Sequence, residues 1–152
     1  MATTLLVLAV IATGLYAGFM FAFASGVMPG LKLLDDEQFV AAMRRINDKV
    51  PGPVFLLVFL GFVALPAAAL AVPVDGRTDD ARLLLVAGLV CAAVSHLVTI
   101  AGNIPLNVAL EKSTASASET RAAFEARWNR LHLARTAVTT ASFALTAGSS
   151  LA

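Results

Sequence analysis

Four long apolar stretches alternate with polar segments along the chain. They cover about residues 4–27, 53–72, 83–107 and 131–151. Each stretch is long enough to cross a bilayer, because a spanning helix needs roughly 20 apolar residues. The polar segments between them are too short to form a soluble domain. The pattern predicts an all-α fold in which residues 1–152 form a single four-span membrane domain, an antiparallel four-helix bundle.

Each long polar segment also contains an amphipathic pattern. Apolar residues recur there at helical spacing, with Phe39, Met43, Ile46 and Val50 in the first segment and Phe124, Trp128 and Leu131 in the second. Arg44, Arg45 and Lys49 fall largely off the first apolar stripe, where they can meet headgroups or water. We expect two amphipathic helices on the cytoplasmic membrane surface. The sequence is also compatible with helices that cover a cavity.

Composition adds support for a membrane protein. Hydrophobic residues make up 59% of the chain and charged residues 14%, whereas a soluble domain has about 25% charged residues. The net charge of +1 gives no sign of a nucleic-acid surface. No Lys or Arg precedes the first apolar stretch, which is also longer than a signal-peptide core, so we expect a mature span. The one cysteine, Cys91, is expected to be a buried small hydrophobe.

The distribution of basic residues predicts the orientation. Nine of the 11 Lys and Arg residues lie in or just beyond the two long polar segments, and two lie in the short turn VDGRTDDAR. The positive-inside rule places the basic segments in the cytoplasm. We therefore expect an integral protein of the bacterial inner (cell) membrane with both long loops cytoplasmic and both termini outside.

Small residues form a stripe on the first span. Gly14, Gly18, Ala22 and Gly26 are four residues apart, and such a stripe allows another helix to approach closely. The partner helix belongs either to the same chain or to a second copy. A homo-oligomer formed through the Gly14/Gly18 face is therefore one expectation.

The third span ends in unusual polar residues. His96, Asn103 and Asn107 share one helix face because they are separated by seven and four residues. Pro105 removes one backbone hydrogen bond and leaves the carbonyl of Ala101 without its donor, so we expect the helix to bend or open there. Polar side chains at this depth usually face a bundle interior or a water-filled cavity.

A second polar stripe enters from the same end of the bundle. Trp128, His132, Arg135 and Thr139 recur at i, i+4, i+7 and i+11 on the last span. We expect the two stripes to meet in one polar pocket close to the cytoplasmic surface. The structural alternative is that the asparagines cap a broken helix, Arg135 reaches the headgroups and Trp128 is an interfacial aromatic residue.

The sequence lacks the common motifs for binding metals, nucleotides and transported protons. The two histidines lack a thiolate cluster or an HExxH motif, so no metal site is predicted. Every Asp and Glu lies in a loop or at a span end, which argues against the common type of proton-driven pump. No phosphate-binding or dinucleotide-binding motif is present, and no cofactor is predicted. The expected partners are the lipid bilayer and a lipophilic small molecule.

Three segments together resemble a known family. GNIPLN spans Gly102–Asn107, RWNRLHLART spans Arg127–Thr136, and MRRIND and PGPVF fall between Met43 and Phe55. By these segments, and by their order and spacing along the chain, nearly the whole chain resembles the small four-span membrane proteins grouped with the fungal anthrone oxygenases. The most specific motifs are N-x-P-L-N and W-N-x-x-H-x-x-R.

The resemblance implies a membrane oxidoreductase that oxidises a flat, lipophilic phenolic or anthrone-like compound with molecular oxygen. An anthrone has an acidic methylene whose carbanion reacts with oxygen directly, so the site needs a base, an oxyanion holder and an apolar slot. Applied to this sequence, residue chemistry makes His132 or His96 the base. It assigns the oxyanion to Arg135, Asn103 and Asn107, and substrate binding to Trp128, Tyr16 and Asn129. A pocket of about 300 Å³ or more is expected.

The alternative is a non-catalytic membrane protein. It would bind a lipid headgroup through Arg127, Arg130 and Arg135, or act as a helper subunit of a membrane complex. This hypothesis predicts no enclosed pocket. It also predicts that Asn103 and Asn107 only repair the helix break.

Overall fold

The computed structural model describes residues 2–74 and 76–152, and within them every regular element is a helix. The first long segment runs through α1 (Ala2–Ala22), the π-helical turn η1 (Phe23–Val27) and α2 (Met28–Lys32). After α3 (Asp36–Lys49) and α4 (Pro53–Ala71), the third segment runs through α5 (Asp79–Val98), the π-helical turn η2 (Thr99–Asn103) and α6 (Ile104–Lys112). The last helix is α7 (Ala117–Gly148).

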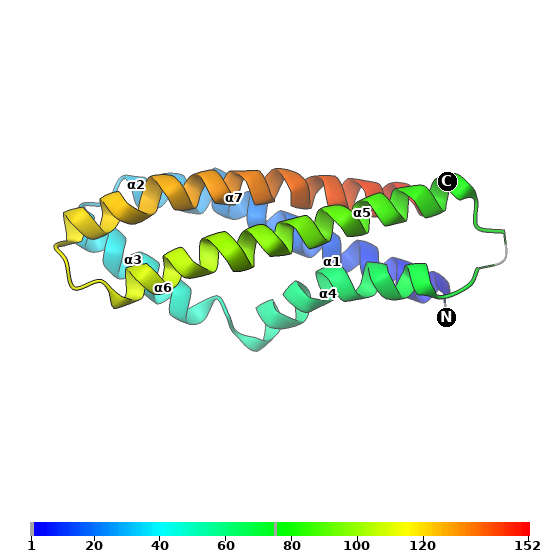
Figure 1. Ribbon diagram of the computed structural model, residues 1–152, viewed down its shortest axis with the longest axis horizontal. Helices are drawn as coiled ribbons and strands as arrows, with labels where there is room; N and C mark the ends of the chain where they lie inside the picture. The colour runs from blue at the N-terminus through cyan, green and yellow to red at the C-terminus, as the bar shows by residue number, and fades with distance from the viewer. Residues whose placement is uncertain (1, 75) are drawn as a thin grey trace.

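Four parts of the chain form long helical segments: Ala2–Lys32, α4, Asp79–Lys112 and α7. They lie side by side in an elongated molecule (Figure 1). Both α4 and α7 pack against α1 and α5, so each long segment has two neighbours. The two termini lie at the same end as the α4–α5 connection, whereas the α2–α3 and α6–α7 connections lie together at the other end (Figure 1). The predicted all-helical class is confirmed.

Three helical segments are long and apolar enough to cross a membrane. They are Ala2–Lys32, Pro53–Ala71 and Asp79–Lys112, and they indicate an integral membrane protein. The expected fourth span at 131–151 corresponds to the second half of α7 and the three residues after it, and α7 is not among the three apolar segments. The reason is that α7 buries a face made largely of polar residues: Thr120, His132, Arg135, Thr136, Thr139, Ser142 and Thr146.

The separation expected between an amphipathic helix and the last span is absent, because α7 is one helix of 32 residues. Its start is fixed by a capping box, in which the backbone N–H of Glu119 donates to Ser116 Oγ and the Glu119 carboxylate accepts from the Ser116 backbone. No proline follows inside the helix to end it.

Two wide turns precede two prolines. In η1 the N–H of Met28 donates to the carbonyl of Phe23, and in η2 the N–H of Ile104 donates to that of Thr99. Both bonds span five residues, and Pro29 and Pro105 follow directly. The expected opening at AGNIP therefore takes the form of a π-helical turn inside a continuous helix, which accommodates the missing proline N–H without a break.

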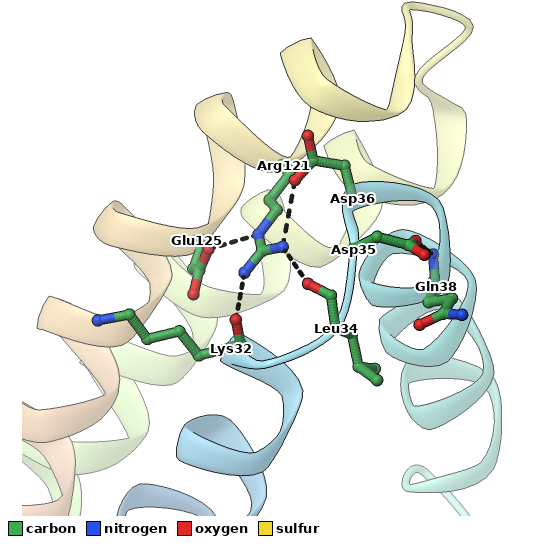
Figure 2. Close-up of polar contacts among 7 residues, drawn as sticks. All are labelled: Lys32, Leu34, Asp35, Asp36, Gln38, Arg121 and Glu125. Carbon is green, nitrogen blue, oxygen red and sulfur yellow. Dashed lines mark hydrogen bonds and ion pairs between the residues drawn. The ribbon is translucent and has the colours of Figure 1, made fainter.

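Arg121 fastens the start of α7 to the α2–α3 connection (Figure 2). Its guanidinium donates to the carboxylates of Glu125 at 2.7 Å and Asp36 at 3.1 Å. It also donates to the carbonyls of Leu34 and Lys32. The hydrogen bond to Glu125 raises the pKa of Arg121 above its ordinary value.

At the same end of the molecule, Arg44 links α3 to the C-terminal end of α6. The sequence predicts that this residue faces headgroups or water, but its guanidinium donates to the carbonyl of Leu110 at 3.0 and 3.2 Å and to that of Ser113 at 2.8 Å. These carbonyls lie at the C-terminal end of α6, where they lack intrahelical partners. Arg44 thereby joins α3 to α6.

Candidate functional site

The two most specific sequence motifs meet at Trp128. The side-chain amide of Asn103 donates to the backbone carbonyl of Trp128 at 3.3 Å. The indole N–H of Trp128 in turn donates to Asn107 Oδ1 at 2.8 Å. Asn103 and Asn107 therefore fix the α7 tryptophan instead of capping a helix break, and the contact holds η2 and α6 against α7.

Arg135 lies about two helical turns further along α7 than Trp128. Its side chain is buried and has no acidic partner. Its Nε donates to His132 Nδ1 at 3.1 Å, and one terminal nitrogen donates to Thr99 Oγ1 at 3.2 Å. Within the described ranges, no carboxylate forms an ion pair with it. The guanidinium also lies 5.4 Å from the ring centroid of Trp128, which is a cation–π distance.

His132 is held in one neutral form by its neighbours. Its Nδ1 accepts from Arg135, whose guanidinium can only donate, so the ring proton belongs on Nε2. That nitrogen lies 3.1 Å from the carbonyl of Met20, which can only accept. The ring also stacks on Trp128 with centroids 4.8 Å apart. Both ring nitrogens are therefore occupied by protein contacts.

A cavity of about 160 Å³ lies in front of this cluster, and we call it the inner cavity. It is smaller than the pocket expected from the sequence. Its walls are mainly aromatic and aliphatic, and the polar groups are few. The lining residues are Phe19, Met20, Phe23, Ile46, Asn47, Val50, Pro51, Phe55, Leu56, Phe59, Thr99, Asn103, Ile104, Asn107, Trp128 and Arg135.

An outer hollow of about 490 Å³ adjoins the inner cavity. Four residues line both spaces: Asn47, Pro51, Ile104 and Asn107. The outer hollow adds the acidic residues Asp48 and Glu111 and opens near the ends of α3 and α6. The two spaces therefore share part of one wall, which is formed by α3, α6 and the segment after α3.

Two buried polar atoms at the inner cavity have no hydrogen-bond partner. They are the oxygen Oδ1 of Asn103 and the nitrogen Nδ2 of Asn47. A buried polar atom without a partner is costly to the folded state. Sequence reasoning missed Asn47 as a site residue, although it lies in the MRRIND motif. Asn47 directly follows Ile46 of the apolar stripe, and this position could have indicated that its side chain faces the interior.

The structure brings four of the predicted site residues to the inner cavity: Asn103, Asn107, Trp128 and Arg135. His132 lies behind Arg135 and does not line it. Asn129 lies in a different hollow, with Lys32 and Arg121, because one helical residue turns the side chain by about 100° from Trp128.

Tyr16 and His96 form a neighbouring aromatic cluster. The Tyr16 ring packs against Phe59 and Phe62, and the His96 ring stacks on Phe59 at 4.0 Å. His96 Nε2 lies 3.0 Å from the carbonyl of Phe59. The Tyr16 hydroxyl and His96 Nδ1 are both buried without a partner. Neither residue lines the inner cavity, although Phe59 does.

The lipid-binding alternative needs three arginines to converge, and the structure separates them. Arg127 and Arg130 are exposed, whereas Arg135 is buried. An inner cavity is also present, and Asn103 and Asn107 are bonded to Trp128.

The conserved profile of the anthrone oxygenase family matches residues 39–145. The chain belongs to the anthrone oxygenase family. The matched range includes the polar residues that line the inner cavity, from Asn47 on α3 to Arg135 on α7. The family membership therefore applies to the part of the chain that forms the site. No curated protein and no solved structure matches the chain.

Proposed function

We propose that this anthrone oxygenase family member oxidises a flat, lipophilic phenolic or anthrone-like compound with molecular oxygen. The observation that carries the proposal is the buried guanidinium of Arg135, which faces an aromatic-walled cavity without a carboxylate partner. The desolvation cost of a buried cation is offset when an anion pairs with it. The anion proposed is the enolate or phenolate oxygen of the substrate.

The proposed chemistry needs little from the protein beyond charge and shape. Binding beside a fixed cation lowers the pKa of an enol or phenol, so its proton leaves to water at the outer hollow. The resulting carbanion reduces oxygen at the methylene carbon. For anthrone the net reaction consumes one O₂ and yields anthraquinone and one water: the methylene loses two hydrogens, and one oxygen atom becomes the new carbonyl. Arg135 stabilises the anion on this path, as an oxyanion hole does.

In this proposal His132 is a positioning residue and not the base. Both of its nitrogens are used, by Arg135 Nε and the Met20 carbonyl, and the ring does not reach the inner cavity. The contact fixes the rotamer of the guanidinium and leaves its remaining N–H groups for the substrate. Trp128, Phe55 and Phe59 supply flat walls against which the rings would pack.

We also propose that α7 crosses the membrane beside the three apolar segments, with its polar face turned inward. The positive-inside rule then places the outer hollow and the α6–α7 connection on the cytoplasmic side and both termini outside. A lipophilic substrate would partition from the bilayer and reach Arg135 from the headgroup level.

Oxygen uptake tests the proposed function. Purified protein in detergent should consume oxygen with anthrone faster than the protein-free mixture. The Arg135→Met variant should lose about 100-fold of that added rate, as expected for the loss of an oxyanion donor. Arg130→Met, which changes an exposed arginine on the same helix, is the matched control and should retain the rate. Equal rates for wild type and Arg135→Met would contradict the proposal.

A further inference from the structure

Within the described residues, a single hydrogen bond joins the guanidinium of Arg135 to another helix. Its Nε donates to His132, which lies three residues earlier on the same helix. The bond from Nη1 to Thr99 Oγ1, at 3.2 Å, crosses from α7 to η2. A guanidinium is planar, so one contact leaves the group free to pivot, and a second contact from another helix fixes its plane. Thr99 therefore sets the direction of the remaining N–H groups.

The hydroxyl of Thr99 is arranged as an acceptor for Arg135. It has one proton, which it donates to the carbonyl of Ser95 at 2.9 Å, and its lone pairs are left for the guanidinium. A bond from threonine back to the carbonyl four residues earlier is by itself a local feature of helices. Thr140 makes the same bond to the carbonyl of Thr136 at 2.9 Å. The contact with Arg135 is what distinguishes Thr99 from such a residue.

The π-helical turn η2 allows this face of the helix to hold Arg135 and Trp128 at once. Ser95 and Asn107 are twelve residues apart and would point about 120° apart on a regular α-helix. A π-helical turn takes up one extra residue and so removes about 100° of this difference. Four residues spaced four apart therefore all reach α7: Ser95 bonds to Thr139, Thr99 to Arg135, and Asn103 and Asn107 to Trp128.

The second terminal nitrogen of Arg135, Nη2, is left for a ligand. It makes no hydrogen bond with the described part of the chain, and unlike Asn47 Nδ2 it is not completely enclosed by other atoms. Arg135 and Thr99 both line the inner cavity. Because Nε and Nη1 are held by protein acceptors on two helices, Nη2 keeps one position relative to the cavity wall.

We propose that Thr99 is a positioning residue for the reaction: its hydroxyl, placed by η2, holds the guanidinium of Arg135 in the orientation that stabilises the substrate anion. This inference rests on the proposed function and extends it, because it names the group on a second helix through which the charge is aligned. Thr99 acts through Arg135 and needs no contact with the substrate.

The fraction of bound anthrone that is enolate tests this role without turnover. The enolate absorbs at longer wavelength than the keto form, so their ratio is read from the absorption spectrum without oxygen, at a pH where wild-type protein holds both forms. Thr99→Val keeps the shape of the side chain and removes the acceptor, whereas Thr99→Ser keeps the hydroxyl. Thr140→Val removes the back-bond to Thr136 from the exposed side of α7 and is the matched control.

Binding of the keto form is measured separately at lower pH. Trp128 is the only tryptophan of the chain and lines the inner cavity, so its fluorescence is titrated with anthrone. We expect the same affinity for the keto form in wild type and in all three variants, because Thr99 aligns a charge and does not form the contact with the ring. Equal affinity also shows that each variant is folded.

We expect Thr99→Val to lower the ratio of enolate to keto form about three- to tenfold, the effect of one hydrogen bond. Thr99→Ser and Thr140→Val should keep the wild-type ratio. An unchanged ratio in Thr99→Val, an equal fall in Thr99→Ser, or the loss of keto-form binding in Thr99→Val would overturn the role of Thr99. Wild-type protein that binds anthrone only in the keto form would instead overturn the proposed function, and this role with it.

Discussion

The most informative single residue is Arg135. Desolvating a guanidinium costs several kcal/mol, and a paired carboxylate usually offsets that cost. Here two neutral acceptors, His132 Nδ1 and Thr99 Oγ1, take the place of a carboxylate. The chain therefore keeps a positive charge in its interior at a cost to stability, which is typical of functional sites.

Replacing this charge should cost the fold little. Arg135→Met removes the desolvation cost but leaves His132 Nδ1 without its donor, an opposing penalty of about 1–3 kcal/mol. We expect the free energy of unfolding to stay within about 2 kcal/mol of wild type, measured by thermal or denaturant unfolding in detergent. A larger loss would mean that Arg135 serves mainly to hold the helices together.

Residue chemistry predicted part of this site and missed part. The convergence of Asn103, Asn107, Trp128 and Arg135 followed from helical spacing, because depth along a helix can be counted from the sequence. The absence of His132 from the cavity wall could not be predicted in this way. It depends on the contact between its Nε2 and the carbonyl of Met20 on another helix.

At the scale of the elements, Gly88 is where the backbones of two helices come close together. A Cβ added at Gly88 would lie 2.7 Å from Thr146 Oγ1 and 3.2 Å from the carbonyl of Ser142, so α5 and α7 pack there nearly backbone to backbone. Ser142 Oγ donates to the Gly88 carbonyl at 2.8 Å at the same place. By contrast, Gly18 has no atom of its own chain within 4 Å of an added Cβ.

Gly88→Ala and Gly18→Ala form a matched pair. Gly88→Ala should lower the free energy of unfolding by about 1–3 kcal/mol because α5 and α7 must separate. Gly18→Ala should be neutral or slightly stabilising, as expected for a helical glycine in open space. Thermal unfolding in detergent compares them. Equal effects would contradict the packing described here, and a loss confined to Gly18 would indicate that a second copy covers that face.

The small-residue stripe was ambiguous in the sequence for a physical reason. Spacing of four identifies a face but not its partner. In the structure Gly14 contacts Phe143 of α7, at 3.1 Å from an added Cβ, whereas Gly18 and Gly26 face open space. A homo-oligomer through Gly18 stays a proposal, while Gly14 already has a partner within the chain.

At the scale of the whole molecule, the unusual feature is a long helix whose polar side faces inward. The apolar runs predicted four spans and an all-helical class; the class is confirmed, and three of the four runs are long apolar helices in the structure. The continuity of α7 was not predicted, because its hydropathy changes from amphipathic to apolar along the chain and this change predicts a boundary, although no proline breaks the helix. Side-chain patterns alone do not distinguish a helix turned toward water from one turned toward a polar core.

Orientation in the membrane can be tested with single cysteines. In a Cys91→Ala background, we expect Thr114→Cys, in the α6–α7 connection, to be protected from a membrane-impermeant maleimide added to intact cells. Asp80→Cys, near the α4–α5 connection, should react; both positions are exposed. The reverse labelling pattern would contradict cytoplasmic long loops. Equal labelling after the membrane is opened is the control for access.

The central claim is that Arg135 holds a substrate oxygen as an anion. The absorption spectrum of anthrone bound to the protein without oxygen tests it most directly, because the extended conjugation of the enolate absorbs at longer wavelength than the keto form. We predict the enolate band with wild-type protein, at a pH where free anthrone is in the keto form, and its loss with Arg135→Met. Bound anthrone that stays in the keto form, or an equal enolate band in both proteins, would contradict the account.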